Sequence, residues 1–186
     1  FRTDDDKWDN NNTSNYTFDI EPATTALTIV EEPKPLRKLR KITEECFIKF
    51  FSFTNFGDLE KLDMYDAPRL NDKAIINISL ISKLRYLDIS WCETVSNVTI
   101  KTIIKNCTYL NKISLQGCKC LDDNLFNDLF FLETDENMKK HLERIRFIDL
   151  NKCDYVTDQM IYNILDKYPN ITIINYYGRD LRDDFV

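Results

Sequence analysis

The chain has little glycine and almost no histidine, and both shortages narrow what it can do. Its 186 residues include three glycines and one histidine, His141. Three glycines cannot build the glycine-rich loop that cradles nucleotide phosphates, and no P-loop pattern occurs. A single histidine excludes multi-histidine metal sites and disfavours Ser-His or Cys-His catalysis. We therefore expect a protein that is not an enzyme and that has no metal site and no cofactor.

Long apolar runs and an excess of positive charge are missing too. No apolar run approaches the roughly 20 residues that a transmembrane helix needs, so we expect no membrane insertion. The net charge of −6 disfavours nucleic acid as the main partner. A hydrophobic share of 43% with only five prolines favours one ordered domain. Because the chain begins at Phe1, we expect a fragment or a processed form, whose targeting signal or upstream domain lies outside it.

Two copies of one unit fill residues 84–129. The first has the sequence LRYLDISWCETVSNVTIKTI and the second LNKISLQGCKCLDDNLFNDL. Leu87 and Ile89 alternate, which predicts one face of a short strand, and the later apolar residues recur at helical spacing. Each unit is therefore strand, turn and helix. One such unit cannot bury its own apolar face, so neighbouring units must stack.

Further copies of the unit begin upstream at Leu59 and downstream at Ile145, and a last strand begins at Ile171. The interval before Ile145 is longer than the others, so we place an insertion near residues 133–140. We predict an α/β solenoid of about four to five repeats, with a parallel sheet on the concave side and helices on the convex side. Residues of N-cap type stand at each predicted helix start: Asn71, Ser96, Asp122 and Thr157.

These residues resemble the cysteine-containing leucine-rich repeat of F-box/LRR proteins. The family pattern is roughly LxxLxLxxCxxITDxxLxxL, and residues 84–103 match it nearly throughout. The resemblance covers about residues 42–178 and implies the substrate-recognition part of an F-box-type ubiquitin ligase, although these 186 residues contain no F-box. The chain is also similar to subunit s of the mitochondrial ATP synthase. That likeness implies a structural or assembly subunit of a larger complex instead.

Six cysteines occur, and three of them, Cys92, Cys118 and Cys153, share one repeat position. Cys107 falls in a column that is apolar in the other units, so we expect it to be buried. Free, buried cysteines indicate a reducing compartment, in the cytoplasm or nucleus, with the mitochondrion as the alternative. Cys118 and Cys120 could start a metal site, but no second pair or nearby histidine completes four ligands.

The sequence divides into a polar N-terminal tail and cap (1–32), a leucine-rich-repeat domain (33–178) and a C-terminal tail (179–186). Residues 27–30 are β-prone, and we expect them to cover the sheet edge. The basic residues 34–41 form either a degenerate first repeat or a patch for phosphate or an acidic partner. Thr43 should then cap a helix that buries aromatic side chains. The charged C-terminal tail should cover the last repeat. The insertion should be a surface loop or a helix extension, and either a contact site or a tolerated solvated segment.

Within each predicted strand, the buried pair of side chains fixes which side chains point outward. Outward residues at equal positions then form columns across the sheet, about 4.8 Å per strand. We predict three columns. They are Lys61, Tyr86, Lys112, Phe147 and Ile173; Asp63, Asp88, Ser114, Asp149 and Asn175; and Tyr65, Ser90, Gln116, Asn151 and Tyr177.

The predicted outward face mixes aromatics with acids and amides, as interfaces do. We expect Tyr86 and Phe147 to be exposed, and we predict that this face binds a protein segment within a hetero-complex. The alternative is an ordinary solvated sheet face, and acid–base catalysis by the aspartates is disfavoured. The candidate partner-binding residues are Lys61, Asp63, Tyr65, Tyr86, Asp88, Trp91, Lys112, Gln116, Phe147, Asp149, Asn151 and Tyr177.

Overall fold

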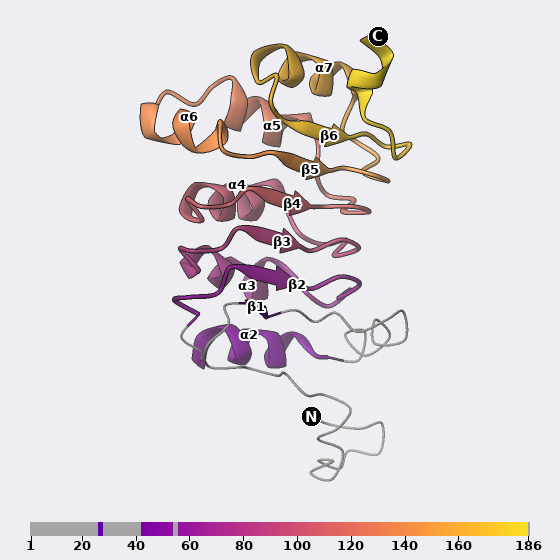
Figure 1. The fold of residues 1–186 in the computed structure, drawn as a ribbon. Coiled ribbons are helices and arrows are strands. Elements are labelled where there is room, and N and C mark those ends of the chain that lie inside the picture. Colours follow the sequence, from indigo (N-terminus) through magenta and orange to yellow (C-terminus); the bar gives the residue numbers. More distant parts are fainter. Residues whose placement is uncertain (1–25, 28–41, 54–55, 186) are drawn as a thin grey trace.

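Parallel strands stack in sequence order, and helices line one side of the resulting sheet (Figure 1). The structure, a computed structural model, describes residues 26–27, 42–53 and 56–185. The strands are β1 (Ala26–Leu27), β2 (Lys61–Asp63), β3 (Tyr86–Asp88), β4 (Lys112–Ser114), β5 (Phe147–Asp149) and β6 (Thr172–Ile174). The helices are α2 (Glu44–Phe53), α3 (Asp72–Ile75) with η2 (Ile76–Leu80), α4 (Asn97–Asn106), α5 (Asp123–Phe130), α6 (Glu136–Leu142), α7 (Asp158–Lys167) and η3 (Leu181–Phe185).

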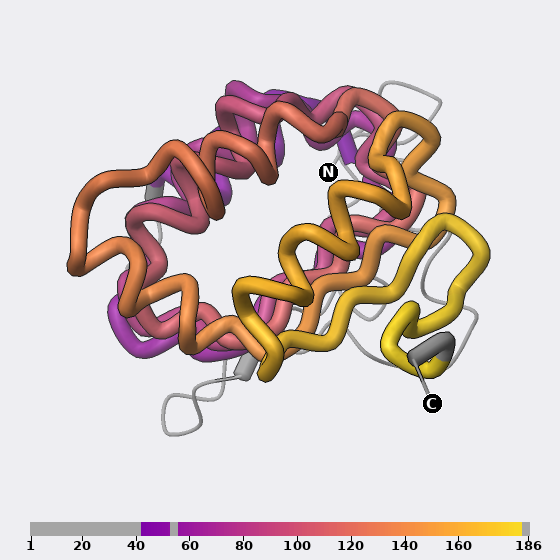
Figure 2. Tube along the Cα trace, turned by 90° about the horizontal axis from the view of Figure 1, so that it is seen from above, coloured from indigo at the N-terminus to yellow at the C-terminus, as the bar shows by residue number. Residues whose placement is uncertain are grey.

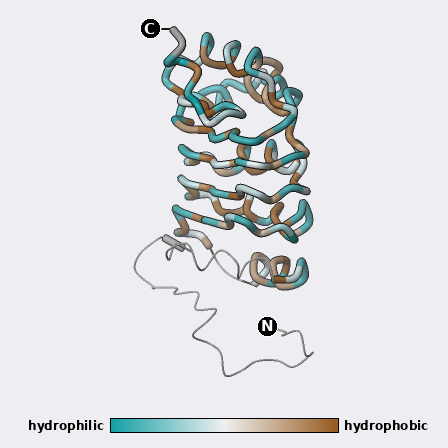
Figure 3. Tube along the Cα trace, turned by 90° about the vertical axis from the view of Figure 1, so that its right-hand side faces the viewer, coloured by the Kyte–Doolittle hydropathy of each residue, from teal (hydrophilic) through white to brown (hydrophobic). Residues whose placement is uncertain are grey.

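The predicted α/β solenoid with a parallel sheet is confirmed. Figure 2 shows the strands and the helices as two layers, and Figure 3 shows apolar stretches in both layers along the stack. Because crossovers between parallel strands need a helix or a comparable segment, each strand is followed by one before the next begins. No helix of the described residues is long and apolar enough to cross a membrane.

The N-terminal end of the sheet begins with β1, which pairs in parallel with β2. This confirms the predicted edge strand at residue 27, whereas residues 28–30 and the basic segment 34–41 lie outside the described residues. The predicted helix is α2. Thr43 Oγ1 accepts the Cys46 amide at 3.4 Å, as expected of its cap. Phe47 and Phe51 are buried, and the ring of Phe50 packs edge-on against Phe51.

The last strand departs from the predicted register. Ile173 pairs with Ile148 and is buried, so the prediction that it points outward is wrong. Asn175 is buried as well. The turn before β6 is the usual one, with the Ile171 amide bonded to Tyr168 O, but the strand begins one residue sooner than in the other units. A slip of one residue moves every side chain of a strand to its other face.

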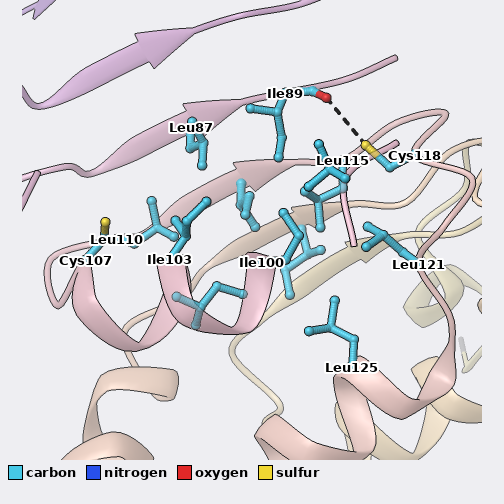
Figure 4. Close-up of a cluster of buried hydrophobic side chains, with 14 of the residues drawn as sticks. Leu87, Ile89, Ile100, Ile103, Cys107, Leu110, Leu115, Cys118, Leu121 and Leu125 are labelled. Carbon is cyan, nitrogen blue, oxygen red and sulfur yellow. Dashed lines mark hydrogen bonds between the residues drawn. The ribbon is translucent and has the colours of Figure 1, made fainter. Parts of the chain in front are cut away.

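The cysteine column is buried, as predicted, and each thiol donates a hydrogen bond to the preceding strand's end. Figure 4 shows the Cys118 thiol directed at Ile89 O, at 3.4 Å. The equivalent bonds join Cys92 to Met64 O at 3.7 Å and Cys153 to Leu115 O at 3.1 Å. Burial raises the pKa of Cys92 and of Cys153 to about 12, so these thiols stay protonated and unreactive near neutral pH.

Thiol labelling should separate the cysteines by their position in the fold. Cys120 is exposed and free, so we expect it to react first with a soluble thiol reagent. The three column cysteines and Cys107, which is also buried, should react only on unfolding. Mass spectrometry of labelled peptides in native buffer and in urea measures this. Native labelling of Cys118 at the rate of Cys120 would contradict the structure.

The predicted helix caps form at three of the four starts. Asn71, Asp122 and Thr157 each accept a backbone amide of their own helix through a side-chain oxygen. Ser96 occupies the N-cap position of α4, but its side chain makes no capping bond. Its backbone amide instead donates to Asp72 Oδ1 at 2.9 Å, across to the preceding helix. The helix starts therefore also hold successive repeats together.

The same connection between helix starts recurs along the stack. The first residue of one helix bonds to the N-cap residue of the next. The bonds join Asn97 Nδ2 to Asp122 Oδ1 at 2.6 Å and the Thr157 amide to Asp123 Oδ1 at 2.8 Å.

The insertion forms a separate helix, α6, so it is neither the predicted surface loop nor an extension of the preceding helix α5. Asp135 caps it by accepting the Asn137 amide at 2.9 Å. Just before it, Glu133 pairs with Lys105 at 2.6 Å. The hydrogen bond from Lys105, together with backbone amides, lowers the pKa of Glu133 to about 2. The predicted contact role of the insertion remains a prediction.

The C-terminal segment covers the last repeat, as predicted. Residues Ile174 and Asp180 form an antiparallel bridge, which brings the chain back along the outer edge of β6. Leu181 is buried, and Arg182 bonds to Asp180 Oδ2 at 2.8 Å and to the Thr172 hydroxyl. Because an uncovered strand edge invites pairing with another chain, this cover protects the end of the sheet.

Candidate protein-binding face

The face of the sheet that points away from the helices carries most of the candidate residues. We call it the outer face. Its columns have the predicted register in β2 to β5 and a changed one in β6. As observed, they are Lys61, Tyr86, Lys112, Phe147 and Thr172; Asp63, Asp88, Ser114, Asp149 and Ile174; and, just beyond the strands, Tyr65, Ser90, Gln116, Asn151 and Tyr176.

The first column alternates cationic and aromatic side chains. Lys61 Nζ lies 4.9 Å from the centroid of the Tyr86 ring, a cation–π contact. Tyr86 and Phe147 are half-buried, so the prediction that they are exposed is wrong. Neighbouring side chains stand only about 4.8 Å away on the adjacent strands, and they cover part of each ring. Lys112, between the two aromatics, is exposed.

The second column holds three carboxylates in fixed positions. Each accepts, through Oδ1, the backbone amide two residues further on. The bonds run from Tyr65 N to Asp63 at 3.0 Å, from Ser90 N to Asp88 at 2.9 Å and from Asn151 N to Asp149 at 2.9 Å. Asp88 also accepts the Tyr86 hydroxyl at 3.3 Å.

These carboxylates are held without a cationic partner. Within the described part of the chain, no lysine or arginine lies within ion-pair distance of Asp63, Asp88 or Asp149. Burial, with a contribution from the charge of Asp88, raises the pKa of Asp63 and of Asp149. Burial and the same aspartates also raise the pKa of Tyr86. Burial therefore disfavours the charged form of these carboxylates. A hydrogen-bond donor or a cation from a partner would stabilise that charged form.

One position of the second column holds a serine in place of an aspartate, and this serine is paired with a second one. Ser114 stands between Asp88 and Asp149, and its hydroxyl lies 2.8 Å from that of Ser90. Both serines are buried, with 8% and 1% of their surface exposed for Ser114 and Ser90. A short, buried side chain, that of Ser114, therefore lies between the two carboxylates.

The third column forms a hydrogen-bonded row of amides. Gln116 Nε2 donates to Asn151 Oδ1 at 2.6 Å, and Asn151 Nδ2 donates to Tyr176 O at 2.9 Å. Tyr176 takes the place that was predicted for Tyr177, because of the slip in β6. Tyr177 is 67% exposed beyond the column, and its ring packs edge-on against Tyr176 at 5.1 Å. Lys152 Nζ lies 4.7 Å from the Tyr176 ring.

Trp91 lies three residues beyond the end of β3 and borders the face. Its backbone is left-handed, with φ of 62°, as at Asp66 and Lys152 in the equivalent turns. The indole packs on Gly117, where an added Cβ would come within 2.5 Å of Trp91 Cε3. The equivalent turns hold non-glycine residues at a similar φ, so it is this close approach of the indole that requires glycine at position 117.

Sequence reasoning missed Tyr176, Lys152 and Thr172 as neighbours of the face. The alternation of Ile171 and Ile173 was the available signal, because it places Thr172 outward one residue earlier than the repeat template does. The residues brought together offer carboxylates, amides, aromatic rings and amines. No group of three or more metal-ligating side chains gathers among the described residues.

The comparisons with known proteins concern the repeat stack. No family model matches the chain. The chain is 23% identical over 151 residues to the Antagonist of mitotic exit network protein 1 of Candida albicans, a match that covers 80% of this chain and 19% of that protein. A chain in the crystal structure of the yeast Rad7 and Elc1 complex superposes with a TM-score of 0.58 at 20% identity. It covers 79% of this chain and 32% of the other.

The fold is a leucine-rich-repeat-like solenoid. The likeness to the solved yeast chain supports this fold at low sequence identity. The chain spans about a fifth of its curated relative and about a third of the solved chain, so it corresponds to one part of each.

Proposed function

We propose that the chain is a protein-binding module whose outer face receives a segment of the partner. The observation that carries this proposal is the set of three in-register columns, with aromatic rings beside fixed carboxylates. In the described part of the chain, helices cover only the opposite side of the sheet (Figure 2). Within those residues, the outer face is therefore open to a partner.

The chemistry of the face indicates what a partner should bring. Aromatic side chains such as Tyr86 and Phe147 are favoured at the energetic centres of interfaces. The fixed carboxylates can accept further hydrogen bonds, and those bonds are stronger from charged donors. A partner segment should therefore place apolar contacts on the first column and N–H donors on the second.

We further propose that the module recognises substrates for a ubiquitin ligase, in the cytoplasm or nucleus. The repeat pattern, which resembles that of F-box/LRR proteins, supports this. The curated relative is named as an antagonist of a regulatory network, and the solved neighbour comes from a complex of two proteins. The alternative remains a structural or assembly subunit similar to subunit s of the mitochondrial ATP synthase.

Removing both aromatic rings should weaken partner binding more than it weakens the fold. Tyr86→Ala with Phe147→Ala should lower recovery of co-purified partners from the native cells at least tenfold. Because both rings are half-buried, we expect a loss of only about 1 kcal/mol of unfolding free energy each, below the 3–5 kcal/mol of a buried phenylalanine. Quantitative mass spectrometry measures recovery, and thermal unfolding measures stability.

The matched control removes two exposed apolar side chains elsewhere. Val98 and Leu132 are 73% and 64% exposed outside the sheet, and Val98→Ala with Leu132→Ala should leave recovery unchanged. Equal recovery with both double variants would remove the outer face as the contact. Ubiquitin-ligase scaffold proteins among the partners would support the ligase assignment. A stoichiometric membrane or organellar complex would overturn it in favour of the structural subunit.

A further inference from the structure

His141 is buried without a hydrogen-bond partner. It lies on α6, and only 4% of its surface is exposed. Within the described part of the chain, neither Nδ1 nor Nε2 has a partner. A neutral imidazole carries one donor and one acceptor, and each unsatisfied group costs about 1–3 kcal/mol when buried. The fold tolerates this side chain, and its protonation would make the cost larger.

Among the described residues, no carboxylate forms an ion pair with His141. On α6 itself, Met138 and Leu142 are buried beside it in the core. The charge that acts on His141 is that of Arg144, which has the same sign as a protonated histidine. Asp135 caps α6, Lys105 pairs with Glu133, and Lys139 pairs with Glu136, on which the charge of Lys140 also acts. Lys167 donates to Phe130 O, and the charge of Glu143 acts on Tyr168.

We propose that His141 makes α6 an acid-sensitive element, which is released from the repeats when the imidazole binds a proton. The protonated ring has two N–H donors and a charge, and it has no acceptor in the buried site. Release brings it to water and exposes Met138 and Leu142. The proposal does not depend on what the outer face binds.

The release should remain local. The helix α6 is an insertion between α5 and β5, and the β4–β5 ladder closes without it. In a solenoid each unit depends mainly on its neighbours, so a segment outside the repeat ladder can open while the stack stays folded.

The lowered pKa of His141 determines the direction of the pH effect. Burial, and then the charge of Arg144, lower the pKa of His141 in the folded state. The stability of α6 is therefore fully present above the unfolded value of about 6.5 and is lost as the pH falls toward the folded pKa. Between the folded and the unfolded pKa, the equilibrium constant for opening of α6 should rise about tenfold for each unit by which the pH falls.

The experiment uses the fact that His141 is the only histidine in the sequence. Its imidazole gives one titrating signal in NMR spectra of the full chain, and we expect a folded-state pKa below 6.5. Hydrogen exchange, corrected for the intrinsic pH dependence, then follows the amides of α6 and α4 from pH 7.5 to 5.5. Protection of α6 should fall about tenfold per unit within the window, while α4 stays protected.

The matched variant is His141→Phe, which keeps a planar ring and removes both nitrogens. Its α6 protection should not change between pH 7.5 and 5.5. A pKa of 6.5 or higher for His141 in the wild type would overturn the proposal, whether or not the variant folds. So would a parallel loss of protection in α6 and α4, or the same pH response in wild type and variant.

Discussion

Replacing Leu87 with alanine is expected to lower the free energy of unfolding by roughly 2–5 kcal/mol, the range for truncating a fully buried leucine. Leu87 is the central residue of β3 and is completely buried. It is in register with Leu62 on one side and Ile113 on the other, so the cavity would lie between two repeats. Interiors are close-packed, and the strand ladder on both sides restricts collapse into the gap.

The position of Leu87 in the stack decides how the loss is seen. A solenoid is stabilised by contacts between neighbouring repeats, and β3 joins the N-terminal repeats to the rest. A cavity there weakens the coupling of the two parts. We therefore expect the urea unfolding transition to shift to lower concentration and also to broaden, because cooperativity between the parts falls.

Urea unfolding followed by circular dichroism measures both effects. The exposed Val98→Ala variant, which truncates an aliphatic side chain on α4, should stay within about 0.5 kcal/mol of the wild type. If Leu87→Ala cost no more than Val98→Ala, the side chain would not face the core. The register of the whole sheet would then be wrong.

Periodicity explains why so much of the stack could be predicted. The buried pair in each unit fixes the face of its neighbours, so the columns from Lys61 to Phe147 and the buried cysteines followed from a template applied several times. The same template failed at β6, because a missing residue before Ile173 cannot be seen by a method that assumes constant spacing. Where strand alternation and repeat spacing disagree, the alternation decides which side chains are buried.

Other features could not be predicted because they depend on distances between repeats. Lys61 lies over the half-buried ring of Tyr86 because β2 pairs with β3, and Asp88, two residues further along β3, accepts the Tyr86 hydroxyl. The bond from the Ser96 amide to Asp72 likewise depends on how two repeats stack. The unpaired ring of His141 depends on how the insertion packs, and no repeat supplies a template for it.

Asn175 illustrates the consequence of the slip, because a residue predicted to face solvent is the buried centre of the C-terminal cover. Its Oδ1 accepts the amides of Tyr177 at 3.1 Å and Arg179 at 3.0 Å. Its Nδ2 donates to Asp158 Oδ1 at 3.2 Å, at the start of α7. Its own amide donates to Arg179 O at 2.9 Å. One side chain thus joins β6, the returning turn and the last long helix.

Asn175→Leu should therefore cost about 2–4 kcal/mol, because it leaves two amides and a carboxylate without their bonds in a buried site. The loss should appear first as fraying of residues 175–183 in hydrogen exchange, since an end of a solenoid can open alone. Opening would expose the edge of β6, so we also expect concentration-dependent self-association by light scattering.

Asn175→Asp tests the same centre through charge. It keeps an acceptor for Tyr177 and Arg179 but places a carboxylate against Asp158, so the pKa of one of the two must rise. A carboxyl group whose pKa is raised by folding stabilises the fold more at low pH than at neutral pH. The stability of this variant relative to wild type should therefore increase as the pH falls from 7 to 4.5. Thermal unfolding at the two pH values measures the difference. If Asn175→Asp and wild type respond to pH alike, the Asn175–Asp158 contact does not form in solution, and the cover is held by Leu181 and Arg182 instead.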